Sequence, residues 1–329
     1  MKKSNLLVSS AALIAATLVL TGCSGSSATL SGGGSTDVAE GLQTVRVSGV
    51  PSENMSAINF GESLGYFEEQ GLHVEVVPAQ GGAAIINGVV QGSQEFGYAT
   101  FPPLAIARSQ GQEIVGVTGS GYMYPDVQIT MVGVKADSDI KTFDDLKGKK
   151  VGVNQLHSFL DICLSAYFLQ KGGDPLAATP VELPFAQLVP STVKGQVDAA
   201  VLTEPFSSIG ISEGLTNIGD ICEASLPESA SVGMFFTSDA YKAENPGTVK
   251  GFDAAMTKTI AYLNDHPEEF AKQIAKDGNL DDAAAADLAP RKQRAEILPE
   301  PTKGYLQILA DLDLIPADKV DSIFKALVP

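Results

Sequence analysis

Short apolar or β-branched runs alternate with segments of helical periodicity from Thr44 to about residue 238. The run TVRVSGV (44–50) has the period of a strand, and the helical segment after it ends at Gly71, a typical C-cap glycine. Strands that alternate with helices predict an α/β fold with a mostly parallel sheet. The expected strands are 44–50, 73–78, 96–99, 113–119, 128–134, 151–153, 181–185, 199–203, 215–221 and 231–238.

The rest of the periodic pattern is helical. Pro102 and Pro103 open one helix, because proline is tolerated in the first turn, where its missing N–H group has no helical partner. A further helix is expected from Phe159 to Lys171, and the chain beyond the last strand is mainly helical. The expected C-terminal helices are 245–276, 302–312 and 319–327.

The N-terminus has the pattern of an export signal. Lys2 and Lys3 precede an apolar run from Leu6 to Leu20, which is shorter than the about 20 apolar residues that span a bilayer but suits a signal-peptide core. The run ends in LTGC, which resembles a bacterial lipoprotein signal with Cys23 as the acylated residue. Residues 1–22 are therefore expected to be a lipoprotein signal peptide; the alternative is an ordinary signal peptide with a chance cysteine. Acyl chains on Cys23 would anchor the protein at the outer face of the cell membrane or in the periplasm.

Composition narrows the classes of partner and site. Residues 23–43 are rich in glycine and serine and predict a flexible tether, while 44% hydrophobic residues are ample for a core. A formal net charge of −17 argues against nucleic acid as a partner, because neutralising phosphates requires clustered lysine and arginine. The few scattered cysteines and histidines predict no metal site, and no cofactor is expected. Cys163 and Cys222 form either a disulfide or two buried free thiols, and the sequence leaves both open.

The stretch NQLHSFLD (154–161) contains the residue types of a hydrolytic triad. Ser158 and Asp161 have the spacing of a capping box, in which the serine oxygen accepts from the Asp161 N–H group and the carboxylate reaches back. A serine engaged in this way is a poor nucleophile, and His157 is poorly placed between nucleophile and orienting acid. The pattern therefore favours a helix start over catalysis.

Five segments of the chain form a recognisable series. In order they are LGYFEEQGLHVEVVPAQGG, VVQGSQEFGYATFPPLAIARSQGQEIVGV, DLKGKKVGV, GQVDAAVLTEPF and ENPGTVKGFDAAMTKTIAYLNDHPEEFAKQI. Each is weak alone, but together, behind a lipoprotein signal, they are specific. The series resembles the nitrate/sulfonate/taurine and thiamine-pyrimidine group of solute-binding proteins of ABC importers.

The resemblance implies a two-lobed periplasmic-binding-protein fold of type II. Each lobe is an α/β unit with a mixed sheet flanked by helices, the second lobe is inserted into the first, and a ligand cleft lies between them. The implied crossings lie near residues 135–140 and 230–233. The implied boundaries are 44–136 and 232–329 for the first lobe and 137–231 for the second.

The resemblance also implies a function. We expect a monomeric, non-enzymatic receptor that passes a small molecule to an ABC permease and its ATPase. One alternative is an enzyme on the same fold, similar to pyrimidine synthases or to enzymes of menaquinone synthesis, although this chain has no cysteine cluster like the iron motif of those synthases. Another is a surface sensor lipoprotein. An adjacent permease gene would favour transport, and an adjacent sensor kinase gene would favour the sensor.

The segments that the topology directs to the cleft supply the candidate ligand contacts. Each has a structural alternative: a polar turn, a helix cap or a core side chain. None of these segments contains Lys or Arg, so the ligand is expected to rest on backbone N–H groups, hydroxyls and His157. Sulfonates and planar heterocycles or aromatic acids are the two expected classes. The candidates are Ser52, Asn54, Ser56, Gly82, Ala83, Thr100, Phe101, Tyr122, Asn154, His157, Ser158 and Glu204, with Tyr124 as a further aromatic side chain.

Overall fold

The computed structural model describes residues 41–124, 128–280, 288 and 290–328. The predicted signal peptide, Cys23 and most of the predicted tether lie outside the described residues. Within the described ranges, no helix is both long enough and apolar enough to cross a membrane.

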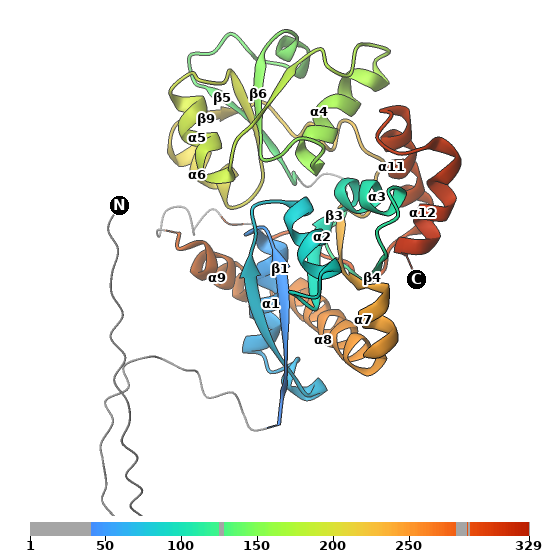
Figure 1. The fold of residues 1–329 in the computed structure, drawn as a ribbon. Helices are drawn as coiled ribbons and strands as arrows, with labels where there is room; N and C mark the ends of the chain where they lie inside the picture. The colour runs from blue at the N-terminus through green and yellow to red at the C-terminus, as the bar shows by residue number, and fades with distance from the viewer. Residues whose placement is uncertain (1–40, 125–127, 281–287, 289, 329) are drawn as a thin grey trace, which may run out of the picture. The chain divides into compact units, whose positions relative to one another are not determined.

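The first sheet contains five strands in the order β2-β1-β3-β10-β4 (Figure 1). β1 runs parallel to β2 and β3, whereas β10 runs antiparallel to β3 and β4. Its central strands are buried, which explains their continuous apolar runs. The bounds are β1 Gln43–Gly49, β2 Leu72–Pro78, β3 Phe96–Thr100, β4 Ile114–Gly119 and β10 Gly233–Ser238.

The second sheet repeats this arrangement with the order β7-β6-β8-β5-β9. β6 runs parallel to β7 and β8, and β5 runs antiparallel to β8 and β9. The bounds are β5 Met131–Lys135, β6 Lys150–Val153, β7 Thr179–Glu182, β8 Ala199–Leu202 and β9 Leu215–Asn217.

The position of β5 differs from the sequence-based expectation in two respects. The strand belongs to the second sheet, whereas the expected boundary at residue 136 assigned it to the first lobe. It also begins later than the expected strand 128–134, because the N–H groups of Ile129 and Thr130 donate to the Asp220 carboxylate, at 2.6 and 2.8 Å, rather than to a neighbouring strand. The same carboxylate binds the backbone beyond β9 through Cys222 N, at 2.9 Å, so β9 is shorter than expected.

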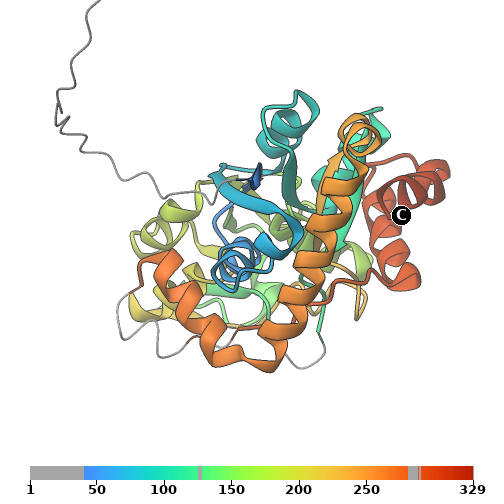
Figure 2. The ribbon, with the colours of Figure 1, turned by 90° about the horizontal axis from the view of Figure 1, so that it is seen from below.

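Helices cover both sheets. α8 and α9 lie beside α1 and pack against it (Figure 2). The helices are α1 Glu53–Ser63, α2 Gly82–Val90, α3 Phe101–Ser109, α4 Phe159–Gln170, α5 Phe185–Val193, α6 Phe206–Ser212, α7 Asp239–Glu244, α8 Pro246–Asp265, α9 Pro267–Gly278, α11 Pro299–Asp311 and α12 Val320–Leu327.

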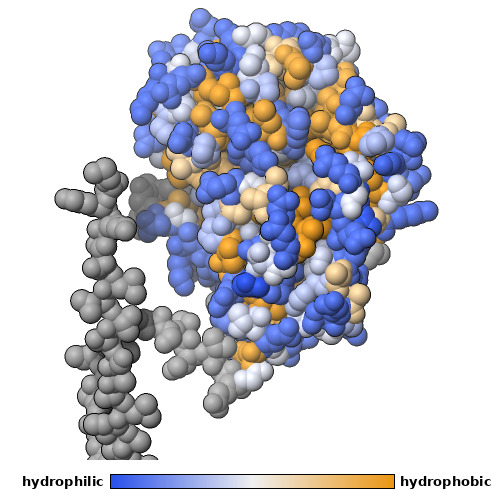
Figure 3. Space-filling model, viewed as in Figure 1, coloured by the Kyte–Doolittle hydropathy of each residue, from blue (hydrophilic) through white to orange (hydrophobic). Residues whose placement is uncertain are grey.

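Aromatic packing fixes the helices on the first sheet. The rings of Phe96 in β3 and Phe252 in α8 stack at a centroid distance of 4.1 Å, and Phe60 in α1 lies 5.5 Å from Phe270 in α9. All four side chains are at most 5% exposed. On the molecular face in Figure 3, apolar patches are interspersed with hydrophilic side chains.

Two segments of the chain connect the sheets. One lies between β4 and β5 and the other between β9 and β10. They pair antiparallel: Met123 N donates to Ala230 O, and Val232 N donates to Gly121 O, both at 2.8 Å. The expected crossing at 135–140 is wrong, since β5 already lies in the second sheet, whereas the expected crossing at 230–233 lies at the end of the second connection, where β10 begins.

A disulfide links a helix beside the second sheet to the segment that follows β9. Cys163 in α4 and Cys222 beyond β9 form a disulfide with a Cα–Cα distance of 4.7 Å. Both residues are fully buried. The disulfide fastens α4 to the segment that Asp220 also holds.

Candidate functional site

A pocket lies where the strand ends and helix starts of both sheets come together. Its volume of about 130 Å³ is roughly ten times the 10–15 Å³ that one water molecule needs, so a small organic molecule fits. Much of its surface is apolar and comes from Val50, Ile85, Ala99, Pro103, Ile129, Phe159, Leu160, Phe185 and Val232.

The polar lining forms two walls. The first-sheet wall consists of Ser52, Glu53, Asn54, Gly82, Tyr98 and Thr100, from the starts of α1 and α2 and the end of β3. The second-sheet wall consists of Asn154, Gln155, His157 and Ser158, between β6 and α4. The walls touch, because Gly82 N at the start of α2 donates to Gln155 Oε1 at 3.1 Å.

Eight of the twelve candidate ligand contacts line this pocket. They are Ser52, Asn54, Gly82, Thr100, Tyr122, Asn154, His157 and Ser158. Because strands β1, β3 and β6 end at this pocket, their following loops converge there, as the topology predicted.

The other four candidates do not line it. Phe101 is fully buried in the core, with its ring 6.5 Å from that of Tyr305. Ser56 is buried within α1, and Ala83 follows Gly82 into α2. Glu204 accepts from Ser208 N at 3.3 Å, which satisfies an N–H group at the start of α6.

Arg291 and Lys292 also line the pocket, so the expectation of a lining without lysine or arginine is wrong. They come from residues 290–298, which contain no helix or strand and precede α11, and the topology expected from the sequence did not direct them to the cleft. The basic run RKQR (291–294) was the available signal.

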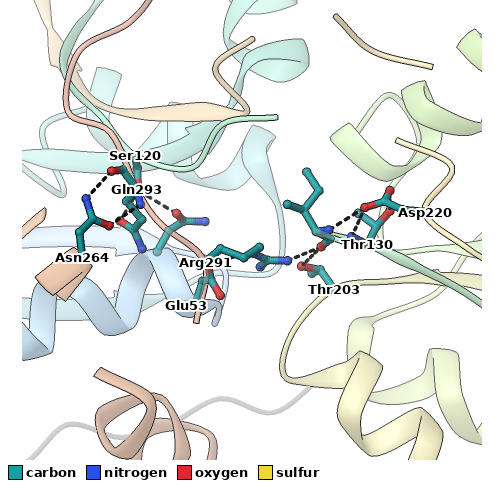
Figure 4. A network of polar contacts seen from close by, with 10 residues as sticks. Glu53, Ser120, Thr130, Thr203, Asp220, Asn264, Arg291 and Gln293 are labelled. Carbon is teal, nitrogen blue, oxygen red and sulfur yellow. Dashed lines mark hydrogen bonds and ion pairs between the residues drawn. The ribbon is translucent and has the colours of Figure 1, made fainter. Parts of the chain in front are cut away.

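Arg291 is held between two acceptors (Figure 4). Its Nε atom lies 3.1 Å from Glu53 Oε1, and its guanidinium also donates to the Ile129 carbonyl oxygen. The side chains of Arg291 and Glu53 are only 13% and 4% exposed. Burial alone would lower the pKa of Arg291, but the adjacent Glu53 carboxylate outweighs it, so the pKa is raised and the charge is retained.

Two pocket hydroxyls are buried without a hydrogen-bond partner among the described residues: Tyr98 Oη and Ser52 Oγ. Ser52 is the N-cap residue of α1, yet its side chain makes no capping bond. Burial raises the pKa of Tyr98, and the charge of Glu53 adds to this while Arg291 opposes it. The Tyr98 hydroxyl therefore stays protonated beside the ion pair.

The second-sheet wall pairs the Ser158 hydroxyl and the His157 N–H group differently from the predicted capping box, and Asp161 Oδ1 beside it is buried without a partner among the described residues. Ser158 is the N-cap of α4, but its hydroxyl donates to Asn154 Oδ1 at 2.9 Å instead of capping the helix. Asp161 Oδ2 accepts from His157 N at 2.7 Å, not from Ser158 N. His157 has a φ of 58°, a left-handed conformation that turns its N–H group toward the carboxylate.

The described residues contain no group of three or more His, Cys, Asp or Glu side chains arranged to hold a metal ion. The pocket offers a bound molecule hydrogen-bonding groups, one buried ion pair and apolar surface.

Sequence comparisons identify relatives of two kinds. The family model described as NMT1/THI5 like matches residues 52–270. A 4-amino-5-hydroxymethyl-2-methylpyrimidine phosphate synthase of Aspergillus parasiticus is 21% identical over 63% of this chain and 62% of that enzyme. A Brucella abortus protein named as a binding protein is 26% identical over 67% of this chain and 66% of its own length. The chain thus matches just under two thirds of the length of each.

The fold also has a counterpart among solved structures. The periplasmic aliphatic sulphonate binding protein SsuA of Escherichia coli aligns with a TM-score of 0.67 at 19% identity, covering 83% of this chain and 88% of that one. Together with the two mixed, helix-flanked sheets, this likeness confirms the periplasmic-binding-protein fold expected from the sequence.

Proposed function

Because the chain belongs to the NMT1/THI5-like family, we propose that it is an extracytoplasmic receptor for a small organic solute. In this proposal each sheet is the core of one lobe, and the solute binds between the lobes without being transformed. Lipid on Cys23 holds the monomeric receptor at the membrane, where it delivers the solute to the permease and ATPase of an ABC importer.

The observation that carries the proposal is the pocket itself. Its lining comes from both sheets and from both connecting segments, so a bound molecule touches every part whose relative position changes when such lobes close. Its largely apolar surface and few convergent polar groups suit a sulfonate, a planar heterocycle or an aromatic acid.

The state of the polar side chains supports binding rather than catalysis. The hydroxyl of Ser158 donates to Asn154 rather than to His157, so no base activates it. Cys163 and Cys222 are bonded to each other and offer no thiolate.

The second candidate function is pyrimidine synthesis, favoured by the name of the Aspergillus relative. The two functions are separated by purifying the full chain in detergent without refolding and identifying any retained small molecule by native mass spectrometry. A receptor returns that molecule unchanged after incubation, and cells lacking the protein lose its uptake. Conversion of the molecule by the purified protein would overturn the receptor proposal.

A further inference from the structure

The inner end of the pocket has hydrogen-bonding groups that the protein does not use. Tyr98 is only 5% exposed, and neither its hydroxyl nor that of Ser52 has a partner among the residues that the structure describes. Leaving a buried hydroxyl unpaired is unfavourable, and most such groups in proteins are satisfied. Two of them lining one pocket indicate that a bound molecule supplies the missing partners.

This end of the pocket is electrically neutral. Glu53 and Arg291 form a buried ion pair at 3.1 Å, and Arg291 also donates to the Ile129 carbonyl. An anionic group placed here would be repelled by Glu53 at low dielectric, and Arg291 offers little compensation because its Nε and one terminal nitrogen already donate to Glu53 and to the Ile129 carbonyl. The other cationic residues of the lining, Lys292 and His157, are exposed to solvent, unlike Glu53 and Arg291.

We propose that Tyr98 and Ser52, beside the Glu53–Arg291 pair, form a head-group subsite for an uncharged group that both donates and accepts hydrogen bonds, such as a carboxamide or a ring amide. Its carbonyl oxygen accepts from the two hydroxyls, and its N–H group donates toward Glu53. The inference rests on the proposed function and narrows its solute class to uncharged planar compounds, in preference to sulfonates and carboxylates.

Matched probe pairs test the charge preference. Nicotinamide is compared with nicotinate, and benzenesulfonamide with benzenesulfonate, by calorimetry and by thermal shift at equal concentrations. At least one uncharged probe should bind at least tenfold more tightly than its anionic partner. Equal or tighter binding of the anions, or binding by none of the four, would overturn the subsite.

Tyr98→Phe tests the hydroxyl, with Tyr305→Phe as the matched control. Both hydroxyls are buried without a partner among the described residues, but Tyr305 does not line the pocket. Tyr98→Phe should weaken the uncharged probe at least tenfold without lowering the melting temperature of the probe-free protein. Tyr305→Phe should leave the affinity unchanged. Unchanged affinity in Tyr98→Phe, or equal losses in both variants, contradicts the proposal.

Glu53→Gln tests the electrostatics, with Glu95→Gln as a control, because Glu95 pairs with Arg46 away from the pocket. Removing the Glu53 charge should improve nicotinate binding at least tenfold, while Glu95→Gln leaves it unchanged. No gain in Glu53→Gln would overturn the neutral-head inference. Tight binding of an anion that is recovered unchanged would do so too, yet would leave the receptor function intact.

Discussion

The two polar walls of the pocket differ in how their groups are paired. On the second-sheet wall, Ser158 donates to Asn154 and the His157 N–H group donates to Asp161. On the first-sheet wall, the hydroxyls of Ser52 and Tyr98 have no partner within the described part of the chain.

This difference separates two uses of polar residues at one site. Groups that satisfy each other fix the shape of a loop and are indifferent to what enters the pocket. Unpaired groups that line the pocket are open to a bound molecule, so in the proposed subsite they select which chemistry is accepted. In the proposed subsite, the second-sheet wall therefore serves mainly as scaffold and the first-sheet wall as the specificity surface.

The largest expected effect tests the scaffold. Cys163 and Cys222 close a loop with a sequence separation of 59, so removing the disulfide in Cys163→Ala/Cys222→Ala should lower the free energy of unfolding by about 4 kcal/mol. Urea unfolding measures the loss, and the reduced natural chain is the control. If the second-sheet wall is scaffold, probe affinity at low temperature stays within twofold. A large loss of affinity in the folded variant would show that the second-sheet wall also contributes to ligand recognition.

The next effect tests the specificity surface. Arg291→Met removes one partner of a buried ion pair and leaves Glu53 as an unpaired buried charge, which should cost about 3 kcal/mol in unfolding free energy. Glu53→Gln in the same chain should restore part of that loss, since both charges are then gone. Arg46→Met is the control. The Arg46 side chain, which pairs with Glu95, is 42% exposed, so its loss should lower the free energy of unfolding by about 1 kcal/mol or less. Equal losses in the two single variants would contradict the assigned burial.

The fold was largely predictable, because buried strands and amphipathic helices leave a period in the sequence. The predicted start of α4 at Phe159 and the return strand that became β10 illustrate this. The misassigned strand β5 shows the limit. Its apolar run fits either sheet, and its sheet and its start are decided by long-range partners, β8 and the Asp220 carboxylate.

The site was predictable only where it follows topology. Loops after parallel strands converge, so Asn54, Thr100 and Asn154 were directed to the pocket correctly. Arg291 was missed, because it lies in the irregular stretch 290–298 and reaches the pocket through tertiary contacts to Glu53 and Ile129. Likewise, no local pattern reveals that Ser158 bonds Asn154 instead of capping its helix.

The smallest expected effect is on the pH dependence of stability, where two carboxylates near helix starts, Asp161 and Asp145, should act in opposite directions. Burial raises the pKa of Asp161, although the hydrogen bond from His157 N opposes this. The exposed Asp145 has a lowered pKa, because Lys141 N and Thr142 N donate to it. A raised carboxyl pKa stabilises the fold below the unfolded pKa of about 3.9, and this contribution is lost as the pH rises through the folded value. A lowered pKa does the reverse.

Asp161→Asn and Asp145→Asn should therefore change the pH dependence of stability in opposite directions. Relative to the natural chain, Asp161→Asn should gain stability between pH 4 and pH 7, because the natural chain must bury a charge over that range and the variant does not. Asp145→Asn should be less stable than the natural chain at pH 7. This loss of stability should shrink as the pH falls below about 4 and vanish once the folded natural carboxyl, with its lowered pKa, is also protonated. Urea midpoints at half-unit pH steps measure both slopes. Slopes of the same sign would contradict the raised pKa of Asp161. They would mean that hydrogen bonds stabilise the Asp161 carboxylate as well as they stabilise that of Asp145.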